Sequence, residues 1–250
     1  MQTTPAIEIK DLCKTYKGND VPAVDHLSLT IPQGAIMGLL GPNGAGKTTI
    51  IHILCGLRSF DKGDVTICSC SLRSQLKAIR PLIGVVPQDI ALYPALTACE
   101  NLKIFGSILG LKGAALNNRI NELLSFFGLE SHKHRRVGNY SGGMKRRINL
   151  IAGLLHHPKV LFLDEPTAGI DVQSKHLILE NLKAVNREGS TIIYTSHYME
   201  EAEALCTQVA FIDEGKIIRQ GVPGELIRLS DGCASLEALY LQLTGKKLRD

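Results

Sequence analysis

The chain has 250 residues, 44% of them hydrophobic and 21% charged, and its formal net charge is +4. A chain of this length and composition buries a sizeable core, which excludes a disordered or fibrous protein. The small charge does not favour a nucleic-acid clamp, and no apolar run reaches the ~20 residues that span a bilayer.

The first part of the chain combines short strand patterns with one helical pattern. Alternating or continuous apolar residues predict strands over 6–16, 27–31, 35–41, 63–68 and 82–87. After a glycine-rich segment, helical spacing predicts a helix over 47–57 that stops at a glycine.

The middle of the chain has a different character. Between residues 95 and 157, amphipathic helical stretches are separated by glycines, with no strand pattern between them, over 98–111, 116–129 and 144–157. We interpret this segment as an all-helical insertion.

The last part returns to alternating strands and helices. It predicts a buried strand over 159–164, a helix over 172–189, a strand over 191–197, a helix over 198–206 and a hairpin over 208–221 turned by "DEG". Such alternation implies a mostly parallel sheet with helices on both faces.

The seven cysteines are an odd number and include no CxxC pair, and "CSC" at 68–70 is too tight for the usual zinc knuckle. We therefore expect reduced, mostly buried thiols in a cytosolic protein. The start of the chain, "MQTTPAIEIKDL", lacks the basic and then apolar layout of a signal peptide, so we expect none.

A glycine-rich segment, "GPNGAGKT", lies between a predicted strand and a predicted helix. It fits G-x-x-x-x-G-K-[ST] at Gly41, Gly46, Lys47 and Thr48, in the context that this pattern requires. The glycines let backbone N–H groups approach phosphates, Lys47 neutralises the β- and γ-phosphates, and the Thr48 hydroxyl is suited to Mg²⁺. The segment predicts a phosphate loop rather than a chance turn.

Two adjacent carboxylates end the predicted strand in "VLFLDEP". Asp164 follows a run of apolar residues, where a carboxylate is costly unless it faces a cation or its water shell. Asp164 is therefore suited to Mg²⁺ and Glu165 to polarising an attacking water. The alternative interpretation is a simple surface turn.

A second candidate anion site occurs far from the phosphate loop. The stretch "NYSGGMKRR", 139–147, places a serine and two glycines before a run of positive charges at the start of a predicted helix. Free backbone N–H groups and the helix dipole favour an anion at such a position.

The phosphate loop, "YSGGM" and "LFLDEP" stand in the order and spacing of ABC-type ATPases, and the chain resembles the nucleotide-binding subunits of ABC transporters along nearly its whole length. The resemblance implies an α/β P-loop NTPase fold, with a mostly parallel sheet flanked by helices, a small antiparallel β subdomain and an inserted all-helical subdomain. The implied domains are an ATPase domain over 1–225, made of core segments 1–94 and 158–225 and helical subdomain 95–157, and a C-terminal helical extension over 226–250.

The resemblance also implies further site residues. Tyr16 matches the aromatic that stacks on adenine, Gln88 the glutamine that touches Mg²⁺, and His197 the switch histidine that reaches the γ-phosphate. Asp171, in "GID" at 169–171, matches the D-loop. Taken singly, these residues also fit a strand aromatic, a turn residue, a strand-end histidine and a helix N-cap.

The implied cofactors are ATP and Mg²⁺, with Glu165, His197 and Gln88 as catalytic residues and Thr48, Gln88 and Asp164 around the metal. The residues implied to bind the nucleotide are Tyr16, Asp171 and the whole phosphate loop, which is Gly41, Pro42, Asn43, Gly44, Ala45, Gly46, Lys47, Thr48 and Thr49.

In ABC ATPases the signature loop serves the other chain of a head-to-tail pair. By resemblance, Ser141, Gly142 and Gly143 of one subunit cover the γ-phosphate bound by a second ATPase subunit, which we expect to be an identical copy. The signature departs from the commonest family pattern at Tyr140 and Met144, and the D-loop at Ile170. These departures resemble ATPases that serve exporters of drugs, lipids or polysaccharides.

The resemblance implies an ATPase subunit that drives a separate membrane permease from the cytoplasmic face of the cell membrane, with no nucleic-acid partner. The family couples to the permease through the segment after the glutamine, here 91–102. The alternatives are a soluble ABC ATPase acting on DNA or the ribosome and a P-loop GTPase. Only 92 residues (49–140) separate Thr48 from Ser141, too few for the long coiled coil of chromosome-type members, and no N-K-x-D guanine reader is present.

Overall fold

The computed structural model describes residues 4–230 and 232–245. Its helices and strands follow one another as β1 (Ile7–Lys14), β2 (Val24–Ile31), β3 (Ile36–Leu40), α1 (Lys47–Leu54), β4 (Lys62–Ile67), β5 (Cys70–Ser71), α2 (Leu76–Ile79), β6 (Ile83–Val86), α3 (Ala98–Ile108), α4 (Gly113–Phe126), α5 (Gly142–Leu154), β7 (Val160–Asp164), α6 (Val172–Arg187), β8 (Thr191–Ser196), α7 (Met199–Leu205), β9 (Gln208–Asp213), β10 (Lys216–Gly221), α8 (Pro223–Arg228) and α9 (Leu236–Thr244).

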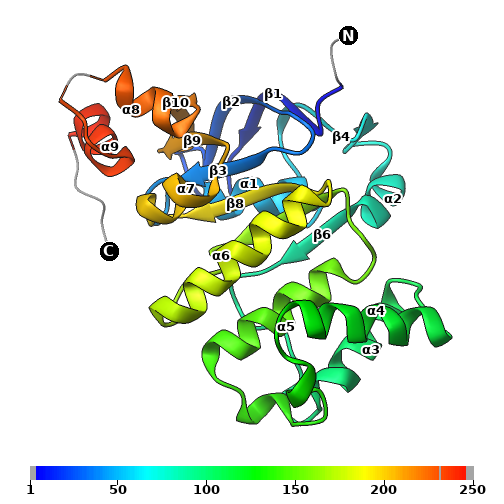
Figure 1. The fold of residues 1–250 in the computed structure, drawn as a ribbon. Helices are drawn as coiled ribbons and strands as arrows, with labels where there is room; N and C mark the ends of the chain where they lie inside the picture. The colour runs from blue at the N-terminus through cyan, green and yellow to red at the C-terminus, as the bar shows by residue number, and fades with distance from the viewer. Residues whose placement is uncertain (1–3, 231, 246–250) are drawn as a thin grey trace.

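The strands form two sheets (Figure 1). The larger one has the order β10-β9-β3-β8-β7-β6, and its neighbours are parallel except for the β9–β10 hairpin. Every residue of β3, β7 and β8 is buried, which explains why β3 and residues 160–163 of β7 are continuous apolar runs rather than alternating ones. The smaller sheet, β2-β1-β4-β5, is antiparallel. The predicted fold class is confirmed.

Each face of the parallel sheet has its own apolar core. Leu39 and Phe162 point to one face, where they pack with α1 and the antiparallel sheet, so α1 lies between the two sheets. Leu40 and Leu163 point to the other face, which α5, α6 and α7 cover. Because side chains alternate along a strand, neighbouring residues of one strand stabilise two separate layers.

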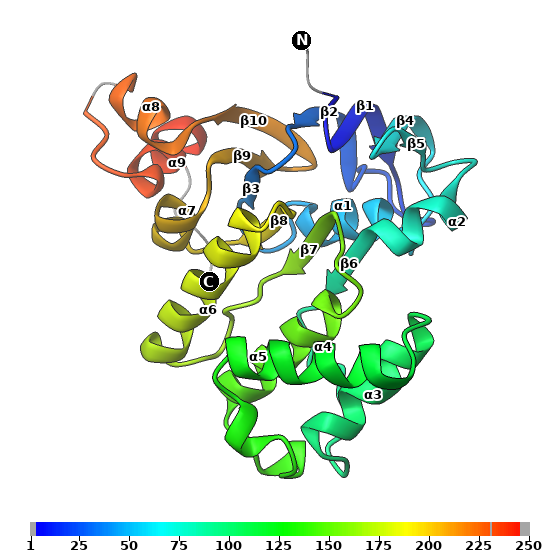
Figure 2. The same ribbon diagram turned by 45° about the vertical axis from the view of Figure 1, so that its right-hand side comes forward.

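The three long helices predicted between residues 95 and 157 are present, and α3, α4 and the first part of α5 lie to one side of the sheet (Figure 2). The end of α5 instead packs on β6. A Cβ at Gly84 would lie 2.3 Å from the carbonyl oxygen of Gly153, so these two backbones approach as closely as glycine allows. Helix α5 therefore connects the helical part to the sheet. The domain boundaries remain a prediction.

The predicted hairpin after α7 is confirmed. Its turn residues Glu214 and Gly215 have φ values of 47° and 78°, the positive pair that a two-residue hairpin turn requires. Sequence patterns did not predict β5, α2 or α8, because elements of two, four and six residues are too short to show a period. The predicted C-terminal helical extension over 226–250 contains the end of α8 and the whole of α9, and its residues 231 and 246–250 lie outside the described residues.

The expectation of mostly buried thiols is wrong. Only Cys55 and Cys206 are buried, and burial raises the pKa of both thiols above the usual range. The other five are half-buried, and three of these, Cys13, Cys68 and Cys70, belong to the antiparallel sheet or its turn. An antiparallel sheet keeps one face toward water, which accounts for their partial exposure.

Within residues 4–230 and 232–245, no helix is both long enough and apolar enough to span a bilayer.

Candidate functional site

The glycine-rich segment lies between the end of β3 and the start of α1. Gly41 and Gly46 have φ values of 155° and 104°. A Cβ at Gly41 would lie 2.1 Å from the Ile212 carbonyl oxygen, and one at Gly46 would lie 2.4 Å from that of Ala23. Only glycine fits these two positions. At Gly44, by contrast, a Cβ would meet nothing within 4 Å, so the loop is open on that side.

Helix α1 begins without a side-chain cap. Its N-cap residue is Gly46, and the first backbone bond within the helix is donated by Ile50. The N–H groups of Lys47, Thr48 and Thr49 therefore have no acceptor within the helix. Three donors without a helix acceptor, at the positive end of a helix dipole, fit the oxygens of a phosphate chain.

Lys47 is held against the loop. It is 5% exposed, and its Nζ donates to the carbonyl oxygens of Gly41 at 2.8 Å and Pro42 at 2.9 Å. Burial lowers the pKa of Lys47, while the negative charges of Glu165 and Asp164 act in the opposite direction. An anion bound at the loop would stabilise the charged ammonium, so the position of Lys47 fits a phosphate contact.

Oxygen ligands of the kind that Mg²⁺ prefers lie next to Lys47. The Thr48 hydroxyl donates to Oδ1 of Asp164 at 3.3 Å, and the Thr195 hydroxyl donates to the same oxygen at 2.7 Å. The side chain of Gln88 lies near Asp164 because its amide donates to the carboxylate of the next residue, Glu165. A hydroxyl, a carboxylate and an amide oxygen form a hard donor set, so these residues fit a magnesium ion held together with phosphate oxygens.

Glu165 lies at the centre of the site. It is 9% exposed and has a φ of 45°, a conformation that non-glycine residues rarely adopt and that is held here by a hydrogen bond from its N–H to the Thr195 hydroxyl at 3.0 Å. Its carboxylate has three neighbours. Nε2 of Gln88 donates at 3.2 Å, Nδ1 of His197 lies 3.2 Å away, and Nζ of Lys47 lies 3.9 Å away.

Tyr16 is also part of this group. Its hydroxyl is 3.1 Å from that of Thr49, which places the half-buried ring beside the phosphate loop. The structure thus brings together the phosphate loop, Asp164, Glu165, Gln88, His197 and Tyr16, as expected from the sequence.

The signature residues lie elsewhere. Ser141 caps α5 by accepting a hydrogen bond from Met144 N at 3.2 Å, and Asp171 caps α6 by accepting one from Ser174 N at 2.8 Å. That bond lowers the pKa of the Asp171 carboxyl. A Cβ at Gly143 would lie 2.2 Å from the Ser174 hydroxyl, so the two helix starts touch. In the part of the chain that the structure describes, no hydrogen bond or ion pair joins 141–143 to 41–49.

Sequence patterns missed Arg146, which connects these two regions. It is 5% exposed, and its guanidinium donates to the carbonyl oxygens of Gln88 at 2.5 Å and Ala168 at 3.3 Å. Burial lowers its pKa, and the charges of Asp89 and Glu165 oppose the shift. The available signal was a positive charge on the apolar face of the predicted helix.

A second missed group surrounds Glu201. One of its carboxylate oxygens accepts hydrogen bonds from the hydroxyls of Thr167 and Tyr194, both at 2.5 Å, and the other lies 3.0 Å from Nζ of Lys175. These contacts join α7, which follows His197, to the loop that follows Glu165 and to α6. Burial and the Glu201 charge raise the pKa of the Tyr194 hydroxyl.

Comparisons with known proteins agree with this geometry. A family model described as "ABC transporter" matches residues 24–168. The linearmycin resistance ATP-binding protein LnrL of Bacillus subtilis is 43% identical over 220 residues, which are 88% of this chain and 70% of that protein. The Nod factor export ATP-binding protein I of Ralstonia nicotianae is 43% identical over 235 residues, which are 94% of this chain and 73% of that protein.

Solved structures agree as well. An ATP-binding subunit of an ABC transporter superposes with a TM-score of 0.85 and 28% identity, covering 96% of this chain and all of that one. A dimeric ATP-binding cassette in a post-hydrolysis state, bound to ADP and phosphate, superposes with a TM-score of 0.78 and 27% identity. The match covers 86% of this chain and 98% of that one.

The position of Lys47 leads to a first prediction. Lys47→Ala removes a charge-assisted contact to phosphate and should weaken ATP binding roughly 10- to 100-fold and abolish measurable turnover. Titration with a fluorescent ATP analogue and a steady-state phosphate-release assay measure the two effects. Lys112→Ala, at an exposed position before α4, is the matched control and should bind and turn over normally. Normal turnover in Lys47→Ala would contradict the assignment.

Proposed function

The chain belongs to the ABC transporter family, and we propose that its phosphate loop, Asp164 and Glu165 form half of an ATP-hydrolysing site that the signature loop of a second subunit completes. The observation that carries this proposal is the division of the site residues. Those suited to binding and cleaving ATP gather around Glu165, whereas Ser141, Gly142 and Gly143 lie beside Asp171 and Ser174, without a bond to the phosphate loop.

In the proposed site each group has one task. The N–H groups at the start of α1 and the Lys47 ammonium bind the phosphates, and the Tyr16 ring, whose hydroxyl lies 3.1 Å from that of Thr49, stacks on the adenine. Thr48, Asp164 and Gln88 hold Mg²⁺, which when bound supplies positive charge to the phosphate oxygens. Glu165 accepts a proton from the attacking water, and His197 and Gln88 keep its carboxylate in place.

Two subunits in a head-to-tail arrangement would place each signature loop over the partner's phosphates. The α5 N-terminus suits this role because Ser141 and Gly142 are exposed, Gly142 carries no side chain, and the helix dipole favours an anion. The solved dimeric cassette with ADP and phosphate supports a dimer for this chain. Bound ATP then joins the two subunits, and its hydrolysis separates them.

The ATPase drives a separate membrane permease. The names of the relatives describe export and resistance, and on that basis we propose that this chain powers an exporter from the cytoplasmic face of the membrane. The alternative of a soluble ABC ATPase acting on DNA or the ribosome is not supported by these relatives.

An apolar groove next to the site fits a permease segment. It has a volume of about 790 Å³ and lies between the sheet and the helical part, lined by Ile83, Val85, Pro87, Ala91, Phe105, Ile108, Leu109, Leu111 and others. Ile108 is 75% exposed and Leu109 is 40% exposed. Pro87 and Ala91 flank Gln88, so a permease segment in this groove would contact the chain beside the catalytic glutamine. Of the segment 91–102 that the family resemblance implies for docking, only Ala91 lines this groove, so the groove extends the proposed docking surface beyond that segment.

A charge in the groove should break the contact with the permease. A tagged Ile108→Glu chain, expressed in its native host, should no longer recover the multi-span membrane protein that the unmodified chain recovers from detergent-solubilised membranes, because burying a carboxylate in an apolar interface is costly. Mass spectrometry identifies the recovered protein. Leu229→Glu, 69% exposed after α8, is the control and should recover it. Equal recovery by Ile108→Glu would exclude the groove.

The role of Glu165 gives a further prediction. Glu165→Gln keeps Asp164 and the phosphate loop, so it should bind ATP but hydrolyse it about 10²- to 10⁴-fold more slowly. ATP should then trap a dimer, visible by size-exclusion chromatography. Glu188→Gln, at the exposed end of α6, should behave like the unmodified chain. If Glu165→Gln turns over normally, Glu165 is not the base.

The shared site can be tested by mixing two inactive variants. Ser141→Arg blocks the partner's phosphates but keeps its own phosphate loop, and Lys47→Ala does the reverse. Each alone should be inactive. In a mixed dimer one site contains both substitutions and the other contains neither. Random mixing should therefore restore intact sites to at most about a quarter of the number in the unmodified protein.

Two affinity tags confirm that mixed dimers form, and phosphate release is measured on each variant and on the mixture. Ser131→Arg, at an exposed position before the signature segment, controls for the added arginine and should stay active. Full activity of Ser141→Arg alone would remove the signature loop from the site, and silent mixed dimers would show that one intact site is insufficient.

A further inference from the structure

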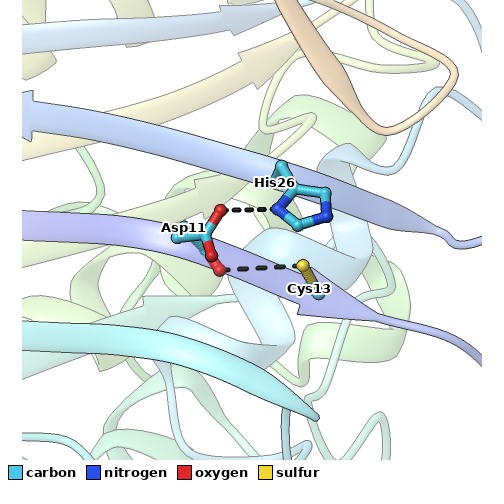
Figure 3. Close-up of side chains that lie close together, drawn as sticks. All are labelled: Asp11, Cys13 and His26. Carbon is cyan, nitrogen blue, oxygen red and sulfur yellow. Dashed lines mark hydrogen bonds and ion pairs between the residues drawn. The ribbon is translucent and has the colours of Figure 1, made fainter.

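Three side chains with metal-binding atoms converge on the exposed face of the antiparallel sheet (Figure 3). They are Asp11 and Cys13 of β1 and His26 of β2. Their ligand atoms all lie within 4.8 Å of one another, and Nδ1 of His26 is 2.6 Å from a carboxylate oxygen of Asp11. The side chains of Asp11 and His26 are 64% and 62% exposed, and Cys13 is half-buried.

Two successive β-bulges create this arrangement. Between the pairs Ile9–Leu29 and Leu12–Leu27, β1 has one residue more than β2, and the extra residue on the outer face is Asp11. Between the pairs Leu12–Leu27 and Lys14–Val24, β2 has one residue more than β1, and this second bulge brings His26 to the same face. A bulge redirects a side chain that regular pairing would place elsewhere. Bulges in opposite strands therefore bring an aspartate and a histidine together.

Both bulge residues have an unusual backbone conformation. Asp11 has a φ of 51° and His26 a φ of 50°, whereas non-glycine residues seldom have positive φ. The neighbouring strand accommodates the bulge through Gly63, where a Cβ would lie 2.4 Å from the Asp11 carbonyl oxygen. Two neighbouring residues thus have a left-handed backbone conformation, and their side chains contact each other. The apolar packing of the sheet does not require this arrangement.

We propose that Asp11, Cys13 and His26 form a binding site for a borderline divalent cation of the Zn²⁺ class, separate from the nucleotide site. A carboxylate oxygen, a thiolate and an imidazole nitrogen are the three ligand types of protein zinc sites. Magnesium and calcium, which prefer oxygen ligands only, do not match this set.

The geometry permits coordination after small side-chain movements. Bonds of about 2.0–2.3 Å to a tetrahedral ion place ligand atoms roughly 3.3–3.7 Å apart. The Asp11–His26 pair would open slightly to admit the ion, and Cys13 would turn from the Asp11 carbonyl oxygen, to which its thiol now donates at 3.7 Å. The thiol proton and any proton on Nδ1 pass to solvent. A water molecule completes the fourth position.

Occupancy would tie β1 to β2 just before the segment that carries Tyr16. Asp61 fixes that segment, because its N–H donates to the Cys13 carbonyl oxygen at 2.9 Å and its carboxylate accepts from Thr15 N at 2.7 Å. The ion should therefore stabilise the folded chain, since it binds the assembled strands and not the separated ones.

Cobalt(II) tests the site, because thiolate ligation gives a near-ultraviolet charge-transfer band. The experiment uses the full chain without a polyhistidine tag or nucleotide and with a non-thiol reductant. The band should rise to saturation at one equivalent, and Zn²⁺ should remove it. Cys13→Ser should abolish the band, and His26→Gln and Asp11→Asn should weaken binding at least about tenfold. Cys70→Ser, a half-buried cysteine of the same sheet, should leave it intact.

Thermal unfolding gives a readout that does not depend on the band. Zn²⁺ should raise the Tm of the unmodified chain and of Cys70→Ser but not that of Cys13→Ser. The proposal is overturned if no saturable band forms, if the band survives in Cys13→Ser, or if Cys70→Ser loses it instead. All variants should keep their circular dichroism spectrum, and a Cys13→Ser chain that is folded and still gains stability from Zn²⁺ would also exclude the site.

Discussion

The buried carboxylate of Glu165 is the group around which the site is organised. At 9% exposure its charge is costly unless several partners face it, and the structure supplies Lys47, Gln88 and His197. Because one carboxylate interacts with all three, a shift of any of them changes the surroundings of the others. The left-handed backbone of Glu165, held by Thr195, belongs to the same constraint.

The parallel sheet makes this gathering possible. Strands β6, β7, β8 and β3 are neighbours and run in one direction, so the segments that follow them leave at the same edge. Gln88 follows β6, Glu165 follows β7, His197 follows β8 and the phosphate loop follows β3. Sheets of this kind bind ligands at the carboxyl ends of their strands. Four segments that are far apart in sequence thereby contribute to one site.

The residues around Gln88 connect this site with the signature helix α5 and with the apolar groove. Arg146 of the signature helix binds the Gln88 carbonyl oxygen, while the Gln88 side chain reaches Glu165. Pro87 and Ala91 line the apolar groove. A movement of α5 or of the groove lining therefore acts on the residue that contacts the Glu165 carboxylate. In the proposed function, the short segment 87–91 is therefore the part of the chain through which nucleotide state, subunit pairing and permease contact would affect one another.

The spacing of apolar runs and glycines was enough to predict the element types, the mostly parallel sheet and the phosphate loop with Asp164 and Glu165, because each of these depends on local patterns in the chain. Family resemblance was needed to predict Tyr16, Gln88 and His197 as site residues, since each alone also fits an ordinary structural role in a strand or turn. Only the tertiary structure revealed Arg146, Thr195 and Glu201, whose hydrogen bonds join segments far apart in the chain. It also decided the meeting of Asp11 with His26, because a bulge shifts the strand register in a way that the alternation of residues does not encode.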